Sequence, residues 1–155
     1  MSIKPDSTLP DFTVQATSSK TVTLSELAGN KVVIYFYPKD HTPGCTTQGQ
    51  DFRDMHEQFL AADTVVFGVS RDSLRTHENF RAKQNFPFEL ISDADETLCR
   101  LFDVIRQKKL YGKEYEGIER STFLIDREGV LRREWRKVKV PGHVAEVLEA
   151  ARELA

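Results

Sequence analysis

Cysteine is scarce in this sequence of 155 residues, which contains only Cys45 and Cys99. The two residues form no CxxC pair and have no spacing typical of a zinc site. Neither a disulfide framework nor a structural metal site is therefore indicated, and we expect both thiols to be reduced.

Long apolar segments are also absent, since no run approaches the roughly 20 residues that a membrane-spanning helix requires. The first ten residues, MSIKPDSTLP, lack the basic start and apolar core of a secretory signal. The formal net charge is -2, from 22 basic and 24 acidic side chains spread along the chain. We therefore expect a cytoplasmic protein that binds neither membranes nor nucleic acid.

Four strand patterns recur along the chain. The strongest is KVVIYFY at 31–37, a β-branched and aromatic run expected when both faces of a strand are buried. Similar runs occupy 64–69 and 121–125, and residues 130–135 follow the turn at 126–129 as a hairpin partner. These four strands are expected to form the centre of one sheet.

Helical patterns alternate with these strands. They cover 45–60, 73–84, a segment after Asp93 in which Asp93 is the expected N-cap and Glu96 lies three places on, and 141–154. No repeat or linker interrupts the chain, which predicts a single domain over residues 1–155. The alternation, closed by an antiparallel hairpin, predicts an α/β fold: a three-layer α/β/α sandwich around a central mixed sheet, with thioredoxin-like topology.

The segment YPKDHTPGCTTQ follows the predicted central strand and carries the strongest functional signal. Pro38, Pro43 and Gly44 interrupt the strand, and Cys45 opens the next helix. There, unpaired N–H groups and the helix dipole favour the reactive thiolate. The dipole supplies only about 0.3–1 kcal/mol, so a further group must help. The hydroxyl of Thr42 can donate a hydrogen bond, and a fixed cation nearby would contribute most.

Structural interpretations remain open beside this functional one. A cysteine in the first turn of a helix can serve packing alone. The two prolines and the glycine favour function, because they hold Cys45 at the sheet edge where ligands collect in α/β folds. A metal site formed by His41, Cys45 and His56 is not indicated, since these residues match no ligand pattern.

The same segment resembles the peroxidatic signature of peroxiredoxins, in particular the Q type, also called bacterioferritin comigratory proteins. Further similar stretches cover most of the chain: PDFTVQ, VTLSELAGNKVVIYFYP, FGVSRDS, FELISDADE and GIERSTFLID. By this resemblance Cys45 would be the peroxidatic cysteine, and Thr42 the hydroxyl that bonds thiolate and peroxide. Arg120, in the last of these stretches, would be the guanidinium that holds both.

The resemblance also implies the surroundings and the activity of the site. Pro38 and Pro43 would shield the pocket, and the backbone N–H of Gly44 or Cys45 would receive a peroxide oxygen. The protein would then be a thiol-dependent peroxidase that reduces hydrogen peroxide and organic hydroperoxides through a Cys45 sulfenic acid. This chemistry needs no metal and no other cofactor.

The sequence departs from the family pattern at two positions. Many relatives carry a resolving cysteine five residues after the peroxidatic one, where this chain has Gln50, and Gln48 stands where a glutamate is frequent. Cys99 lies among apolar residues of a predicted helix and is expected to be a buried structural thiol. We therefore predict a one-cysteine mechanism with an external thiol reductant such as thioredoxin, glutaredoxin or glutathione. Q-type relatives are often monomers, so a monomer is expected.

Two other functions compete with this one. A disulfide oxidoreductase of the same fold would use CxxC, but Cys45 is followed by Thr46, Thr47 and Gln48. A non-enzymatic thioredoxin-like binding module or holdase is the alternative from another class. Such a module would show no peroxide-dependent change at Cys45.

Overall fold

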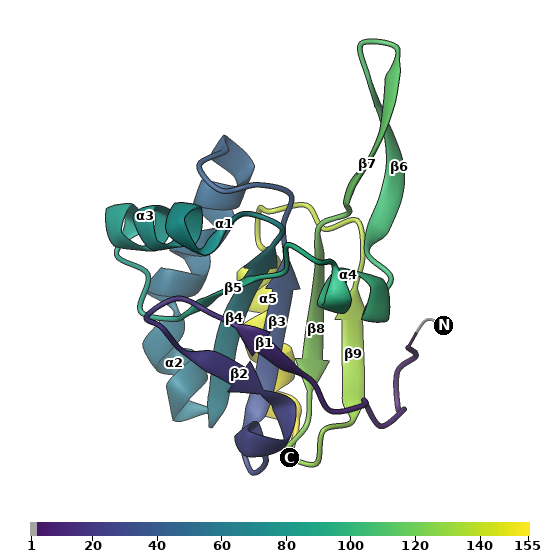
Figure 1. Ribbon diagram of the computed structural model, residues 1–155. Helices are drawn as coiled ribbons and strands as arrows, with labels where there is room; N and C mark the ends of the chain where they lie inside the picture. The colour runs from purple at the N-terminus through teal and green to yellow at the C-terminus, as the bar shows by residue number, and fades with distance from the viewer. Residues whose placement is uncertain (1–2) are drawn as a thin grey trace.

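The computed structural model describes residues 3–155, and its centre is a five-stranded mixed sheet (Figure 1). The strand order is β5-β4-β3-β8-β9. In chain order these strands are β3 (Lys31–Phe36), β4 (Thr64–Ser70), β5 (Leu90–Ser92), β8 (Ser121–Ile125) and β9 (Leu131–Trp135). β3 pairs in parallel with β4 and antiparallel with β8, so it is the central strand that the sequence predicts.

Every residue of β3 is buried, because the strand lies in the centre of the sheet and both its faces are covered. Val33 and Tyr35 point to one apolar cluster, which we call the helical core, and Val32 and Ile34 point to a second, which we call the far core. Side chains alternate across a strand, so the two clusters lie on opposite faces of the sheet.

Helices and short strands cover the two faces unequally. Side chains of α1 (Pro43–Asp54), α2 (His56–Ala61), α3 (Leu74–Gln84) and α5 (His143–Glu153) enter the helical core. The far core is covered by β1 (Thr13–Gln15), β2 (Thr21–Thr23), the 3-10 turn η1 (Leu24–Leu27) and α4 (Thr97–Leu101). Figure 1 shows α5 behind the sheet and β1, β2 and α4 in front of it. The predicted three-layer α/β arrangement is confirmed. Among residues 3–155, no helix has the length and apolar character needed to cross a bilayer.

One further pair of strands projects from the body of the molecule. β6 (Ile105–Leu110) and β7 (Lys113–Ile118) form an antiparallel hairpin with full register between Ile105–Ile118 and Leu110–Lys113. In Figure 1 the hairpin extends beyond the ends of the sheet strands, at the same end of the sheet as the start of α1. The strand patterns had not predicted it, because its residues are mostly polar and exposed.

Two helix predictions were wrong in detail. The helix expected at 45–60 begins at Pro43, a residue suited to the first helical position, and is divided at Met55, whose φ of -104° and ψ of 5° depart from helical values. The last helix begins at His143 instead of Pro141, because Gly142 adopts a left-handed conformation there. The apolar stripe of the first segment still reaches the helical core, since Phe52 and Phe59 are both buried in it.

The predicted cap at Asp93 was also wrong. The N-cap of α4 is Glu96, whose side chain pairs with Arg71 and Arg100. The Asp93 carboxylate instead accepts hydrogen bonds from the N–H groups of Leu98 at 2.9 Å and Cys99 at 2.7 Å. Asp93 therefore satisfies the first turn of the helix from outside its cap position.

Acid should destabilise the protein through His143, which begins α5 with its Nε2 2.8 Å from Thr122 Oγ1. Burial lowers the pKa of His143 to about 4. An unfolded histidine titrates near 6.5, so the unfolded chain binds the proton first as the pH falls. The wild type therefore loses stability as the pH falls from about 6.5 to about 4. We expect this loss to be about 1–3 kcal/mol smaller in His143→Gln. Urea unfolding across this range measures the effect, and an unchanged slope in the variant would contradict it.

Candidate active site

Cys45 lies in the first turn of α1, directly beyond the end of β3. The first backbone hydrogen bond of the helix joins Thr46 N–H to the Thr42 carbonyl at 2.9 Å. The N–H groups of Gly44 and Cys45 therefore have no backbone acceptor within residues 3–155. Cys45 is only 2% exposed, so its sulfur is accessible either to small molecules or after a local opening of the structure.

Arg120 is the cation that hydrogen-bonds to this sulfur. It lies between β7 and β8, and its Nη2 donates to Cys45 Sγ at 3.4 Å. A unit charge at about 4 Å contributes about 4 kcal/mol at an effective dielectric constant near 20, before solvation losses. This exceeds the helix dipole several-fold, so the guanidinium is the dominant electrostatic partner of the sulfur.

Gly44 leaves the space that Arg120 occupies. A Cβ atom at position 44 would stand 3.2 Å from Arg120 Nη2, closer than side chains normally allow. The structure thus brings together three of the predicted site residues: Cys45, Gly44 and Arg120. Nothing in the composition distinguishes Arg120, which the sequence indicated only through its family resemblance.

Gln48 holds the other side of the same guanidinium. Its fully buried side chain accepts a hydrogen bond from Arg120 Nη1 at its Oε1, at 2.6 Å. A neutral amide orients the guanidinium without neutralising it, so the positive charge remains available to Cys45. A glutamate at position 48 would instead have competed with the sulfur for the same cation.

Two predicted site residues, Thr42 and Pro38, form no hydrogen bond with the sulfur in this structure. The hydroxyl of Thr42 donates to the Lys39 carbonyl at 2.8 Å, so its hydrogen is directed to the loop backbone. Pro38 is partly buried and follows Tyr37 at the end of the central strand. Their roles toward a substrate stay predictions.

Tyr35 and Lys108 also respond electrostatically to the site. Burial raises the pKa of Tyr35 well above its usual value, and the negative charge of Cys45 adds to this effect. Burial, with the neighbouring charge of Arg120, lowers the pKa of Lys108, which Cys45 opposes. Tyr35 lies in the helical core and Lys108 on the projecting hairpin. Arg120, which contacts the sulfur, follows β7 by two positions, so the sulfur lies near the base of that hairpin.

A buried polar network anchors the loop that precedes Cys45. The Tyr37 hydroxyl donates to Asp40 Oδ1 at 2.6 Å, and His77 Nδ1 lies 2.6 Å from Asp40 Oδ2. His77 Nε2 lies 3.0 Å from the Ile91 carbonyl, so both groups facing the imidazole are acceptors. Asp40 and His77 therefore form a buried pair in which both ring nitrogens of the imidazole have a hydrogen-bond partner. No sequence pattern indicates this pairing, although Asp40 belongs to the segment YPKDHTPGCTTQ that carries the functional signal.

The same network contains the cluster that most resembles a metal site among residues 3–155. One ligand atom each of Asp40, Asp72 and His77 lies within 4.8 Å of the others. These groups already bond to protein partners, however, because Asp72 Oδ2 accepts from the Asp40 N–H at 2.9 Å and both imidazole nitrogens have acceptors. The arrangement is that of a structural hydrogen-bond network.

Cys99 is separated from Cys45 by the sheet itself. Cys99 is fully buried in the far core, whereas Cys45 belongs to the helical core on the opposite face. Burial, with a hydrogen bond to Asp93, raises the pKa of the Cys99 thiol far above its usual value. The predicted structural role of this thiol agrees with its position, since a neutral buried thiol is a poor nucleophile.

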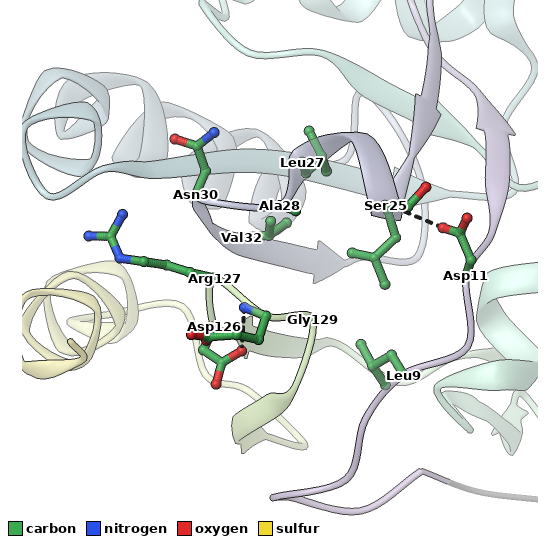
Figure 2. Close-up of a pocket in the computed structure, with 12 residues that line it drawn as sticks. Leu9, Asp11, Ser25, Leu27, Ala28, Asn30, Val32, Asp126, Arg127 and Gly129 are labelled. Atoms are coloured by element: carbon green, nitrogen blue, oxygen red, sulfur yellow. Dashed lines mark hydrogen bonds between the residues drawn. The ribbon is translucent and has the colours of Figure 1, made fainter.

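A separate hollow of ≈160 Å³ lies at the other end of the central strand (Figure 2). Its two aspartates already have partners: Asp11 accepts from the Ser25 N–H at 2.9 Å, and Asp126 accepts from the N–H groups of Glu128 and Val130 at 2.9 Å. The hollow is lined by Val32, near the beginning of β3, whereas Cys45 follows the end of that strand. It is therefore not part of the candidate active site.

Known proteins resemble this chain over nearly its whole length. Residues 5–134 match the AhpC/TSA family. The chain is 51% identical over 155 residues to peroxiredoxin Bcp of Bacillus subtilis, covering 100% of this chain and 99% of the relative. A solved structure of a PrxQ mutant of Xylella fastidiosa has 44% identity and a TM-score of 0.92, covering 97% and 96% of the two chains. A structure of the Xanthomonas campestris bacterioferritin comigratory protein, described for its alkyl peroxide reduction activity, has 52% identity and a TM-score of 0.86, covering 90% and 89%.

Removing the Asp40 carboxylate should release the loop before Cys45. Asp40→Asn retains the shape of the side chain but removes the charge that faces His77, and breaking a buried pair of this kind typically costs about 3–5 kcal/mol. We expect a loss of stability of that order and slower reaction of Cys45 with peroxide. Denaturant unfolding and peroxide kinetics measure the two effects. The exposed Asp54→Asn provides a matched control, and equal stability of the two variants would contradict the assignment.

Proposed function

The chain belongs to the AhpC/TSA family of peroxiredoxins and is a thiol-dependent peroxidase, and we propose that Cys45 is the sulfur that attacks the peroxide. The observation that carries this proposal is the 3.4 Å contact between Cys45 Sγ and Arg120 Nη2 at the start of α1. Cys99, the other thiol of the chain, is buried on the opposite face of the sheet, and no arginine or lysine among residues 3–155 hydrogen-bonds to its sulfur.

The chemical step follows from this geometry. The thiolate of Cys45 attacks one peroxide oxygen, an S–O bond forms and the O–O bond breaks. The sulfur is oxidised to a sulfenic acid, while the second oxygen takes up a proton and leaves as water or as an alcohol. Arg120 stabilises the charge that develops on the leaving oxygen, and the free N–H groups of Gly44 and Cys45 hold the peroxide.

Thr42 and the prolines complete this proposal. The Thr42 hydroxyl can exchange the Lys39 carbonyl for the peroxide by rotation about its side chain, since the two lie in the same loop. Pro38 and Pro43 limit the access of water to the sulfur from the loop side. Hydrogen peroxide and organic hydroperoxides are the proposed substrates, and the alkyl peroxide activity described for the Xanthomonas relative supports the second class.

We further propose that an external thiol reduces the sulfenic acid. A disulfide requires Cα atoms about 4.4–6.8 Å apart, and the sheet stands between Cys45 and Cys99. The helix position of a local resolving cysteine is Gln50, whose amide instead donates to Gln84 Oε1 at 2.9 Å. The attacking thiol forms a mixed disulfide with Cys45 and releases water, and a second thiol then frees Cys45. Thioredoxin, glutaredoxin and glutathione are the candidate reductants.

The remaining expectations concern the cellular setting. A monomer in the cytoplasm that binds no nucleic acid is proposed, with support from two free thiols and a net charge of only -2. A reducing compartment suits a mechanism that depends on a supply of thiols.

Replacing Arg120 should impair the attack on peroxide. Arg120→Ala removes the cation that contacts the sulfur, and we expect the second-order rate constant with hydrogen peroxide to fall about 10²–10³-fold. Alkylation of Cys45 by iodoacetamide at neutral pH should slow as well, because less thiolate is present. Arg152→Ala, on the outer surface of α5, is the matched control and should behave as the wild type. Unchanged kinetics in Arg120→Ala would refute the role of this guanidinium.

The choice of sulfur and the one-cysteine mechanism are tested together by thiol counting. After one equivalent of peroxide, the wild type and Cys99→Ser should each lose the Cys45 thiol and form a sulfenic acid that dimedone traps. Cys45→Ser should consume no peroxide above the buffer rate. Mass spectrometry locates the oxidised sulfur. A disulfide between Cys45 and Cys99 that forms at the turnover rate would overturn the one-cysteine mechanism but not the role of Cys45.

A further inference from the structure

The β6–β7 hairpin projects from the body of the molecule, and most of its residues are exposed (Figure 1). Tyr111 and Gly112 connect its strands with φ of 52° and 78°, which gives a tight two-residue turn. Six residues per strand give the hairpin a length of about 20 Å. Three large apolar side chains lie open on it: Leu110 is 56% exposed, Tyr111 96% and Tyr115 46%. Such an exposed element suits an interaction surface.

The two faces of this hairpin differ in chemistry. Residues directly opposite in an antiparallel pair share a face, so the register assigns each side chain to one of two sets. One face carries Ile105 and Ile118, Gln107 and Glu116, and Lys109 and Glu114. The other, which we call the cationic face, carries Arg106 and Gly117, Lys108 and Tyr115, and Leu110 and Lys113. The cationic face has three basic side chains and no acidic one.

The base of the hairpin fixes which way the cationic face points. Ile118 is part of the far core and Ile105 packs against it, so their face is turned away from the side of the sheet that holds Cys45. The cationic face is therefore on the Cys45 side. Lys108 on this face is close enough to respond to the charges of Arg120 and Cys45.

The cationic face continues outward from the active site. Arg120, which contacts the sulfur, follows the last residue of β7 by two positions. Arg106, at the base, pairs with Asp103 at 3.1 Å, whereas Lys113 at the tip is exposed and has Leu110 opposite it. Lys108 and Tyr115 pack together over Gly117, where a Cβ atom would stand 3.1 Å from Lys108 Cδ. A surface of apolar and basic groups thus leads from the hairpin tip toward Cys45.

We propose that the cationic face is the docking surface for an acidic protein dithiol that reduces oxidised Cys45. The proposal rests on the one-cysteine mechanism given above, which requires a thiol from outside the chain. The Lys108 ammonium donates to the Ile118 carbonyl, which leaves Lys113 as the exposed lysine of this face. Charge complementarity selects the partner, because Lys113 beside the exposed Leu110 and Tyr115 attracts a surface that combines carboxylates with apolar side chains. The position beside Cys45 is what such a reductant needs.

The reaction at this surface is balanced without another reactant. One thiolate of the partner attacks the sulfenic sulfur, an S–S bond forms, and the hydroxide takes up a proton and leaves as water. The second thiol of the partner then displaces the Cys45 thiolate, so the partner ends as a disulfide and Cys45 is reduced.

Two lysines of the same hairpin provide the test. Lys113→Glu reverses a charge on the cationic face, and Lys109→Glu makes the same change on the other face. Each protein is oxidised with one equivalent of hydrogen peroxide, which records the first half-reaction, and is then mixed with reduced thioredoxin, glutaredoxin or dithiothreitol. We expect Lys113→Glu to slow reduction by the protein dithiol about tenfold and Lys109→Glu to change it less than about twofold. Reduction by dithiothreitol should be equal in all three proteins, and added salt should slow the wild type with the protein dithiol.

Several results would overturn the proposal. Equal effects of the two lysine variants would do so, as would a wild type that neither thioredoxin nor glutaredoxin reduces faster than dithiothreitol at equal thiol concentration. A Lys113→Glu variant that changes only the sedimentation of the protein, or only its retention of single-stranded RNA, would assign the face to a second copy or to nucleic acid. Failure of the proposed function appears earlier in the experiment, as an absent Cys45 sulfenic acid or a Cys45–Cys99 disulfide in the oxidation step.

Discussion

One contact between distant parts of the chain organises this protein: the guanidinium of Arg120 against the sulfur of Cys45, at 3.4 Å. The sulfur belongs to the first turn of a helix and the arginine to the junction of two strands, 75 positions apart. Only the central sheet can hold these two segments in register. β3 delivers the cysteine loop and its antiparallel neighbour β8 begins just after the arginine, so the pairing of these two strands sets the distance between charge and sulfur.

The surroundings of this contact protect the charge from competitors. Gln48 orients the guanidinium with a neutral amide, and Gly44 leaves room for it. The loop between β3 and α1 is anchored by Asp40 and His77, which form a buried hydrogen-bonded pair. Polar groups in such a setting are costly when unpaired, and their mutual satisfaction keeps the loop in one conformation.

The sequence predicted the central elements well because their signals are local. KVVIYFY is a strand under any packing that buries both its faces, and the four predicted strands all occur in the sheet. The prediction that Asp93 is the N-cap was wrong because a carboxylate can accept hydrogen bonds from helix N–H groups without occupying the cap position. The β6–β7 hairpin had no apolar alternation to reveal it. At the site, the local sequence pattern indicates Cys45, whereas Arg120 is indicated only by the family resemblance. The Asp40–His77 pair could not be predicted, because it joins a loop and a helix through tertiary structure.

The separation of the two thiols by the sheet also affects the fate of the oxidised protein. Gln50 lies on the same helix as Cys45 and Cys99 on the opposite face of the sheet, so under the proposed mechanism no second thiol of the chain converts the oxidised sulfur to a disulfide. In the proposed mechanism the sulfenic acid would persist until a thiol arrives, and a second peroxide would compete for it by oxidising the sulfur to sulfinic acid, which most thiols do not reverse. The number of turnovers before inactivation would then depend on the ratio of thiol to peroxide, so a shortage of thiols would inactivate the protein irreversibly.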